Sequence, residues 1–247
     1  MRTDVFFGTS TLTAADTAGR TAVVIDVLRA STSIAAALCN GARTIIPLDG
    51  ADEVIIRAKA YERREVLLAG ERRMLPVPGF DVGNSPHEYT REMVEGRTVL
   101  LSTTNGTAAL VAVQGARETI VTSYANFSVS VNYLVSALQR GSDVTIVCAG
   151  RERQFSLEDT ACAGRLVRYL IGAIPELELN DAARAAMLIE SAYGDDLRRI
   201  FSESAHGQAL ADAGFESDLE ICAATDAFPV VPVYSDHRIV ALSQAAE

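Results

Sequence analysis

The chain has 247 residues, which is enough for one large α/β domain, and its 49% hydrophobic and 22% charged residues are typical of a globular protein. Its formal net charge of -10 argues against nucleic acid or an anionic membrane as a partner, because both bind basic surfaces. No apolar stretch is long enough to span a membrane, and no secretory signal follows Met1, so we expect a cytoplasmic protein. The four cysteines show no metal-ligand spacing and are expected to be reduced thiols.

Segments rich in β-branched residues alternate with alanine-rich helical patterns as far as residue 171, which is typical of βαβ units. We therefore expect an α/β fold layered helix/sheet/helix, with a largely parallel or mixed sheet. The predicted strands are 22–27, 44–48, 65–69, 98–101, 119–122 and 144–148, and the predicted helices are 33–42, 51–63, 87–94, 107–114, 126–139 and 157–171.

The pattern changes in the last third of the chain. Two helical stretches, 181–192 and 195–213, follow one another without a strand between them. The proline-flanked segment 229–234 is then typical of an edge strand at the C-terminal end. We expect a single α/β unit over 1–247, and a second lobe beginning near 141–175 stays open as an alternative.

Several predicted strands end in small polar residues, and the carboxyl ends of parallel strands lie along one edge of a sheet, where ligands bind. Asp26 ends the first of them, and a buried carboxylate is costly unless it is paired or binds a metal. Arg29, Ser31 and Thr32 follow at the start of the next helix, where hydroxyls and N–H groups suit a phosphate or sulfonate. A capping or turn role is the alternative for Asp26 and for the two hydroxyls.

A second strand-to-helix turn, 102–107, is dense in hydrogen-bond donors. Its Asn-Gly pair favours left-handed backbone geometry, so that amides can converge on an anion, and a well-capped turn is the alternative. The long loop 70–86 carries three prolines and three glycines, and loops of this length inside compact domains are usually functional. Glu158 and Asp159 open a later helix, where acidic residues are common for dipole reasons alone, but their place after a strand also makes them candidates for acid–base chemistry or magnesium.

The motifs that the sequence lacks narrow the chemistry. There is no Gly-x4-Gly-Lys-Ser/Thr nucleotide loop and no Gly-x-Ser-x-Gly nucleophile elbow. Leu28 stands where an aspartate-nucleophile phosphatase of the haloacid dehalogenase type would carry its second aspartate. The three histidines have no metal spacing, so zinc is not expected, whereas carboxylate oxygens suit magnesium.

Taken together, these segments resemble the 2-phosphosulfolactate phosphatase family from Asp4 nearly to the C-terminal end. The resemblance rests on 24–32, 70–72, Gly-Phe-Asp-Val-Gly-Asn-Ser-Pro at 79–86, Ser-Thr-Thr-Asn-Gly-Thr at 102–107, Asn126, 148–150 and 158–159. It implies a magnesium-dependent (Mg2+) phosphohydrolase of α/β fold, a homodimer, that converts 2-phospho-3-sulfolactate to 3-sulfolactate on the route to coenzyme M. Met74 and Arg153 stand where the family usually carries glycine, in two loops expected to line the site.

We therefore predict a site in which Asp26, Arg29, Asp81 and Glu158 are catalytic and Asp26, Asp81 and Asp159 hold magnesium. The predicted substrate-binding residues are Ser31, Thr32, Arg72, Asn84, Ser102, Thr103, Thr104, Asn105, Gly106, Asn126 and Cys148. The alternatives are a phosphatase for another phosphorylated hydroxy acid and a non-catalytic anion-binding or regulatory module. The carboxylates interleaved with anion donors count against the module, since without a cation they would repel the ligand.

Overall fold

A computed structural model describes residues 1–152 and 154–242 of the chain. The strands are β1 (Arg2–Phe6), β2 (Thr21–Ile25), β3 (Thr44–Pro47), β4 (Val66–Arg72), β5 (Leu75–Pro76), β6 (Thr98–Ser102), β7 (Glu118–Thr122), β8 (Val144–Cys148), β9 (Glu178–Leu179), β10 (Pro232–Ser235) and β11 (Arg238–Ala241).

The helices are α1 (Ala14–Thr17), α2 (Ala30–Cys39), α3 (Ala51–Ala58), α4 (Arg91–Val94), α5 (Gly106–Ala112), α6 (Phe127–Gln139), α7 (Leu157–Ala173), α8 (Asp181–Tyr193), α9 (Leu197–Glu203), α10 (Ala205–Asp212) and α11 (Glu216–Ala223). Short 3-10 helices lie at Thr9–Thr11, Arg63–Glu65, Pro86–Glu88 and Tyr124–Asn126. None of the helices in the described part of the chain combines the length and the apolar character needed to cross a bilayer.

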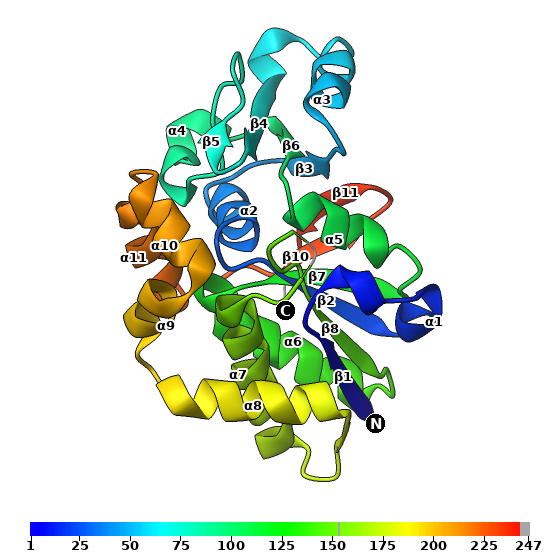
Figure 1. The fold of residues 1–247 in the computed structure, drawn as a ribbon. Coiled ribbons are helices and arrows are strands. Elements are labelled where there is room, and N and C mark those ends of the chain that lie inside the picture. The colour runs from blue at the N-terminus through cyan, green and yellow to red at the C-terminus, as the bar shows by residue number, and fades with distance from the viewer. Residues whose placement is uncertain (153, 243–247) are drawn as a thin grey trace.

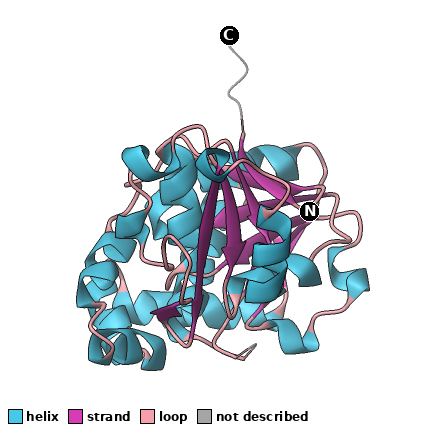
Figure 2. Cartoon of the chain, turned by 90° about the horizontal axis from the view of Figure 1, so that it is seen from above, coloured by secondary structure: helices cyan, strands magenta, loops and turns pink. Residues whose placement is uncertain are grey.

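The described strands form one mixed sheet in the order β5-β4-β6-β3-β11-β10-β7-β2-β8-β1-β9 (Figure 1). Helices cover both faces of this sheet (Figure 2), so the predicted layered α/β fold is confirmed. One parallel group contains β7, β2, β8, β1 and β9, and a second contains β4, β6 and β3. β8, which falls in the segment where a second lobe could begin, lies between β2 and β1 in the same sheet.

The C-terminal strand is present, but it lies inside the sheet rather than at its edge. β10 pairs antiparallel with β7 and with β11, and β11 pairs antiparallel with β3. The flanking prolines suggested an edge because proline cannot donate a ladder hydrogen bond. Pro232 is the first residue of β10, where that loss matters least. The hairpin β10–β11 therefore joins the two parallel groups.

β2 shows why the sequence pattern identified the central strands so clearly. All five of its residues are buried, as expected for a parallel strand covered on both faces. Val23 and Ile25 pack into the core under α6 and α7, whereas Ala22 and Val24 pack into the core under α2 and α5. This alternation follows from the two-residue period of a strand and leaves Asp26 as the first residue beyond it.

The helical region after residue 195 differs from its prediction. The predicted stretch 195–213 is two helices, α9 and α10, which meet at Ser204. The Ser204 hydroxyl accepts a hydrogen bond from Gly207 N, which caps the second helix at its start. A third helix, α11, follows, and with the other two it forms one side of the molecule in Figure 1.

Candidate active site

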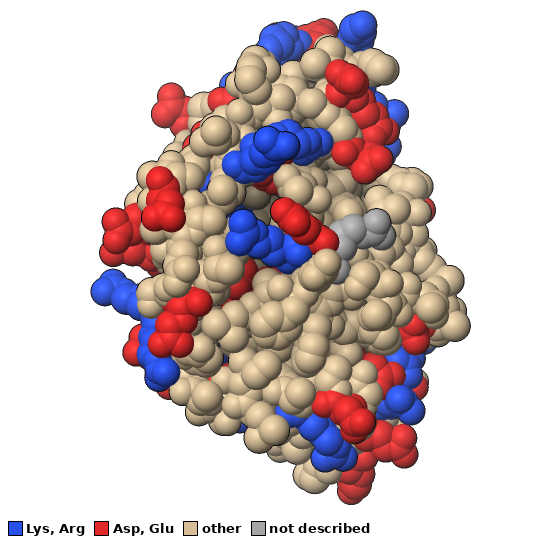
Figure 3. Space-filling model, viewed as in Figure 1, with Lys and Arg blue, Asp and Glu red and all other residues tan. Residues whose placement is uncertain are grey.

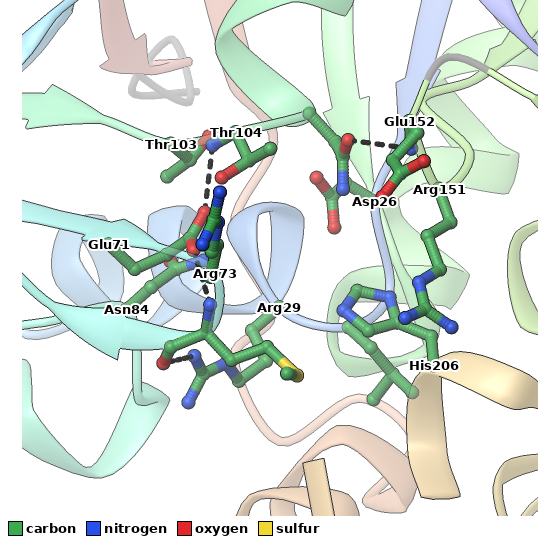
Figure 4. A pocket seen from close by; sticks show the side chains of 13 residues that line it. Asp26, Arg29, Glu71, Arg73, Asn84, Thr103, Thr104, Arg151, Glu152 and His206 are labelled. Carbon is green, nitrogen blue, oxygen red and sulfur yellow. Dashed lines mark hydrogen bonds between the residues drawn. The ribbon is translucent and has the colours of Figure 1, made fainter. Parts of the chain in front are cut away.

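A cavity of about 300 Å³ lies beyond the carboxyl ends of β2, β4, β6 and β8 (Figure 4). It has the size of a small-molecule site and the position expected for a ligand crevice in an α/β sheet. The cavity is lined by six of the predicted residues, namely Asp26, Arg29, Asn84, Thr103, Thr104 and Asn105. Its lining also includes Met74, which lies in a loop expected to line the site, and residues that were not predicted, among them Glu71, Arg73, Arg151, Glu152 and His206.

Asp26 is a buried carboxylate in the wall of the cavity, and its side chain and backbone anchor the β2–α2 turn. Its Oδ1 accepts a hydrogen bond of 3.3 Å from Ala30 N, and its own N–H donates to the Ser31 hydroxyl. Burial raises the pKa of Asp26 to about 6, and the nearby carboxylates of Glu71 and Glu158 add to this rise, whereas His206 opposes it. A carboxylate with such a pKa beside a cavity marks a functional site more often than a structural one.

Gly106 allows the next element to approach Asp26 closely. A Cβ at this position would lie 2.7 Å from the Ala30 Cβ and 3.0 Å from Asp26 Oδ2. The start of α5 therefore packs directly against the β2–α2 turn. Gly106 is not among the residues that line the cavity, and the structure shows it in this close packing, which only a residue without a side chain allows here.

The hydroxyls of Ser31 and Thr32 form hydrogen bonds with the backbone of the β2–α2 turn. Ser31 accepts from Asp26 N, and the Thr32 hydroxyl donates to Val27 O over 3.0 Å. Neither residue is among those that line the cavity. Both hydroxyls therefore shape the local backbone, which is the alternative that the sequence left open.

Arg29 lines the cavity, but its guanidinium is already bound. Its Nη1 forms a 2.7 Å ion pair with Asp218 of α11, and both side chains are only 2% exposed. Its Nη2 donates to Met74 O over 2.7 Å, and the group stacks 4.4 Å from the centre of the Phe215 ring. Arg29 is therefore an anchor between the strand edge and the C-terminal helices, rather than a free cation for an anionic ligand.

Arg72 is bound in a similar way, to a neighbouring strand. Its guanidinium donates to the Ser102 hydroxyl over 2.8 Å and to the Ser102 carbonyl over 3.2 Å. Neither Arg72 nor Ser102 is among the residues that line the cavity. The next residue, Arg73, lines it instead, because the chain turns sharply there through two left-handed residues, Arg73 and Met74.

Glu71 was not predicted as a site residue, yet it joins two walls of the cavity. Its Oε1 accepts a 2.7 Å hydrogen bond from Thr104 N, and its Oε2 accepts a 2.8 Å bond from Met74 N. The side chain thus links the β4–β5 turn to the β6–α5 turn. The only signal in the sequence was its place at the end of a predicted strand, next to Arg72.

Asp159 and Glu158 stand at the start of α7 with different partners. Asp159 accepts hydrogen bonds from Val27 N over 2.8 Å and from Gly150 N over 3.0 Å, so it ties the β2–α2 turn to the β8–α7 loop. Burial, followed by the charges of Glu158 and Asp26, raises its pKa well above the usual value. Glu158 is 1% exposed, its Oε1 lies 3.3 Å from His206 Nδ1, and its buried Oε2 has no hydrogen-bond partner among the described residues.

Glu158 and Asp159 are not among the residues that line the cavity, and neither are three further predicted site residues. Asp81 accepts a 2.8 Å hydrogen bond from Leu68 N and pairs with Arg63, so it holds the long loop against β4. Asn126 donates to Val121 O and Val230 O from a fully buried position. Cys148 is fully buried as well, and burial raises the pKa of its thiol. The structure does not bring Asp81 to the cavity that Asp26 lines.

His206 reaches the cavity from a segment that carries no site signal in the sequence, whereas Arg151 and Glu152, themselves not predicted, belong to a loop that was expected to line the site. His206 lies in a helix whose pattern predicts only packing, and Arg151 and Glu152 lie in the loop that follows β8. The Glu152 N–H donates to Asn105 Oδ1 over 3.1 Å, which brings this loop to the β6–α5 turn. Arg153, one of the two departures from the family pattern, lies outside the described residues.

The side chains of this cavity that could ligate a metal ion are the carboxylates of Asp26, Glu71 and Glu152 and the imidazole of His206. Within 1–152 and 154–242, no group of three or more His, Cys, Asp or Glu side chains is arranged to hold a metal ion. The buried Oε2 of Glu158 has no hydrogen-bond partner among the described residues, although Glu158 does not line the cavity, and no hydrogen bond within the described chain reaches Asp26 Oδ2 in the cavity wall. Magnesium suits such a set, because it is commonly held by one or two carboxylates together with water and substrate phosphate.

Comparison with known proteins identifies the family of the chain. The profile of the 2-phosphosulpholactate phosphatase family matches residues 7–237. A probable 2-phosphosulfolactate phosphatase of Symbiobacterium thermophilum is 41% identical over 229 residues, which cover 93% of this chain and 97% of the relative. Proteins of the same description from Thermotoga petrophila, 41% identical over 86% of this chain and 88% of theirs, and from Clostridium acetobutylicum, 32% identical over 97% of this chain and 100% of theirs, also match. The chain therefore belongs to the 2-phosphosulpholactate phosphatase family.

Proposed function

We propose that this chain is a phosphatase that hydrolyses the phosphate ester of a small anionic acid, with 2-phosphosulfolactate as the substrate and 3-sulfolactate as the product. These relatives carry this substrate in their names, and two of them match at 41% identity. In cells this product would serve coenzyme M synthesis. The cavity of about 300 Å³ is of a size that accepts a three-carbon acid with its phosphate.

The observation that carries the proposal is the surroundings of Asp26. A carboxylate that is 6% exposed, with its pKa raised to about 6, faces a cavity whose other walls carry the hydroxyls of Thr103 and Thr104 and the side-chain amide of Asn105. A carboxylate alone would repel a phosphate. The combination of anion donors with buried carboxylates fits a site that holds a cation together with a phosphate.

The residues present fit magnesium. Asp26 and Glu158 would hold the ion through Asp26 Oδ2 and Glu158 Oε2, and its charge would offset the repulsion between the two carboxylates, which adds to the larger effect of burial in raising the pKa of Asp26. When bound, magnesium polarises the phosphoryl group and neutralises its developing charge. Asp159 is less suited as a ligand, because both of its oxygens already accept backbone hydrogen bonds.

Hydrogen bonds to the buried carboxylates of Glu71 and Asp159 hold the loops that form the cavity walls in place. Glu71 holds the backbone of Thr104 in place, and Asp159 holds the loop after β8 against the loop after β2. These buried bonds fix the walls before the substrate arrives, which is how preorganised donors stabilise charge in a transition state.

The test is phosphate release by the purified chain from 2-phosphosulfolactate and from a panel of phosphorylated 2-hydroxy acids, with magnesium and with a chelator. We expect turnover that requires magnesium and that falls by at least about 10²-fold in Asp26→Asn. Asp143→Asn, a partly exposed carboxylate just before β8 that pairs with Arg20, is the matched control and should keep its activity. Absence of phosphate release from every ester would refute the proposal, whereas turnover in chelator would refute the role of magnesium only.

A further inference from the structure

We propose that Arg73 and Arg151 form a clamp that binds the acidic groups of the substrate other than the phosphate, namely the sulfonate and the carboxylate on either side of the phosphate-bearing carbon. This inference rests on the proposed phosphatase function and names the side chains that select its substrate class. Four arginines come into question, because 29, 73 and 151 line the cavity and 72 lies beside it.

The partners of these arginines separate them into two pairs. Arg29 is engaged by Asp218, Met74 O and the Phe215 ring, and Arg72 is engaged by Ser102. Arg73 has no hydrogen bond or ion pair with any described residue, and Arg151 has a single hydrogen bond, 3.2 Å from its Nη1 to Ala205 O. Arg73 and Arg151 are therefore the cavity cations with donor groups left for a ligand.

The depth of Arg73 and Arg151 in the cavity indicates which group of the substrate they contact. Asp26, Asn84 and Thr103 are buried, whereas Arg73 and Arg151 are exposed. In the proposed mode of binding the phosphate lies next to the buried carboxylate, so the carbon skeleton with its carboxylate and sulfonate lies nearer the entrance. Figure 4 shows the two arginines on opposite sides of Asp26, and Figure 3 shows basic side chains on two sides of a hollow on this face.

The backbone at both arginines gives independent support. Arg73 and Met74 have φ values of 51° and 72°, and Glu152, next to Arg151, has a φ of 53°. Such left-handed conformations are unfavourable for residues with a side chain, and they cluster at ligand sites where the surrounding structure imposes them. Six residues other than glycine adopt them in the described chain, and these three all line the cavity.

A guanidinium suits the proposed ligand. Its planar array of donors pairs with two oxygens of a carboxylate or sulfonate at once, and the charge offsets the repulsion from a protein with a net charge of -10. Glu152 is exposed beside Arg151 and opposes the binding of an anion. The clamp thus carries two positive charges and one negative charge. Removal of an arginine should weaken the binding of the anionic substrate, whereas removal of the Glu152 charge should strengthen it.

The test compares two esters of the same three-carbon skeleton: 2-phosphosulfolactate, and isopropyl phosphate, which lacks both the carboxylate and the sulfonate. In Arg73→Gln and Arg151→Gln we expect kcat/KM for the sulfonated ester to fall by about 10- to 100-fold, through KM more than kcat, because a charge-assisted pair is lost. Isopropyl phosphate should change by less than about threefold, while Glu152→Gln should raise kcat/KM for the sulfonated ester by about twofold or more. Arg64→Gln, an exposed arginine that precedes β4, is the matched control.

The possible outcomes are distinct. Equal losses for both esters would assign the arginines to the phosphate or to folding and would overturn the clamp, as would no loss for either ester. Calorimetric binding of 3-sulfolactate to the intact chain separates the clamp from the proposed function. Binding that weakens in Arg73→Gln and Arg151→Gln supports the clamp even without turnover, whereas absence of binding and of turnover would overturn both.

Discussion

Arg29 illustrates how one residue can line a cavity and still act on the fold. Its ion pair with Asp218 is buried on both sides, and Asp218 also accepts a 2.6 Å hydrogen bond from the Ser85 hydroxyl. The pair therefore joins the β2–α2 turn, the long loop and α11. Loss of one partner from a buried ion pair leaves an uncompensated charge, which is more costly than the pair is worth.

We therefore expect Arg29→Ala to lower the free energy of unfolding by about 3–5 kcal/mol, measured by urea denaturation. Arg29→Ala with Asp218→Asn should recover part of this loss, because no isolated charge remains. Arg91→Ala, at an exposed pair with Glu95, is the control and should cost at most about 0.5 kcal/mol. An Arg29→Ala chain with unchanged stability and a large loss of kcat/KM would restore the anion-binding role that the sequence predicted.

Asp26 links stability to pH. Its pKa is raised by burial from 3.8 to about 6, so the folded state favours the protonated carboxyl. That contribution to stability is fully present below about pH 4 and is lost as the pH rises through 6, above which the fold contains a costly buried charge. At pH 8 without magnesium, Asp26→Asn should therefore be more stable than the unsubstituted chain by about 1–3 kcal/mol.

The measurement is urea denaturation at pH 4 and pH 8 in chelator, followed by the same experiment with magnesium. The difference between the two chains should shrink at pH 4, and magnesium should stabilise only the chain that keeps Asp26. A lower stability of Asp26→Asn at pH 8 would contradict the origin assigned to this pKa.

At the scale of elements, the site depends on the close contact between α5 and the β2–α2 turn. Gly106→Ala would place a Cβ 2.7 Å from the Ala30 Cβ, so we expect a cost of about 1–3 kcal/mol together with a fall in activity. Gly172→Ala is the matched control, because a Cβ at this position of α7 would meet no atom within 4 Å and alanine favours a helix. Its stability should stay equal or rise by up to about 1 kcal/mol in thermal unfolding. Equal stability of the two variants would show that the contact at Gly106 relaxes freely.

The elements that the sequence identified share one physical property. β2, β6 and β8 are buried on both faces, so their apolar runs are continuous and the polar residues that follow mark the site. β11 has only one buried residue, Ile239, and α11 has few, so their patterns carried little information. The contribution of His206 depends on how α10 folds back over the sheet edge, and no local pattern records such a long-range contact.

The roles of the arginines at the site could not be predicted from the sequence alone. The sequence predicted that arginines near the strand ends would attract the anion, but which of them is free depends on partners such as Asp218 and Ser102. Asp218 lies 189 positions beyond Arg29 in the chain. Sequence spacing therefore located the cavity, whereas tertiary pairing decided the roles inside it.

At the scale of the whole molecule, the hairpin β10–β11 is the joint between the two parallel groups of strands. Ile239 is fully buried and pairs with Ile45 of β3, whereas the adjacent Val240 is 39% exposed. We expect Ile239→Ala to lower the free energy of unfolding by about 2–5 kcal/mol and Val240→Ala by less than about 1 kcal/mol. Fluorescence and circular dichroism should report a single coincident transition for both variants. Separate transitions in the Val240→Ala control would show that the two groups of strands fold independently.

The position of this hairpin has a consequence for the order in which the protein is made. A chain emerging from the ribosome presents β2, β6 and β8 long before residues 232–241. Until those residues emerge, β7 and β3 each lack a neighbour, and two open strand edges are exposed to other nascent chains. The cavity walls supplied by β4 and β6 are also not yet joined to those supplied by β2 and β8 through the sheet. The nascent chain therefore depends on β10 and β11 to cover the open edges of β3 and β7. It is most prone to aggregate just before these two strands emerge from the ribosome.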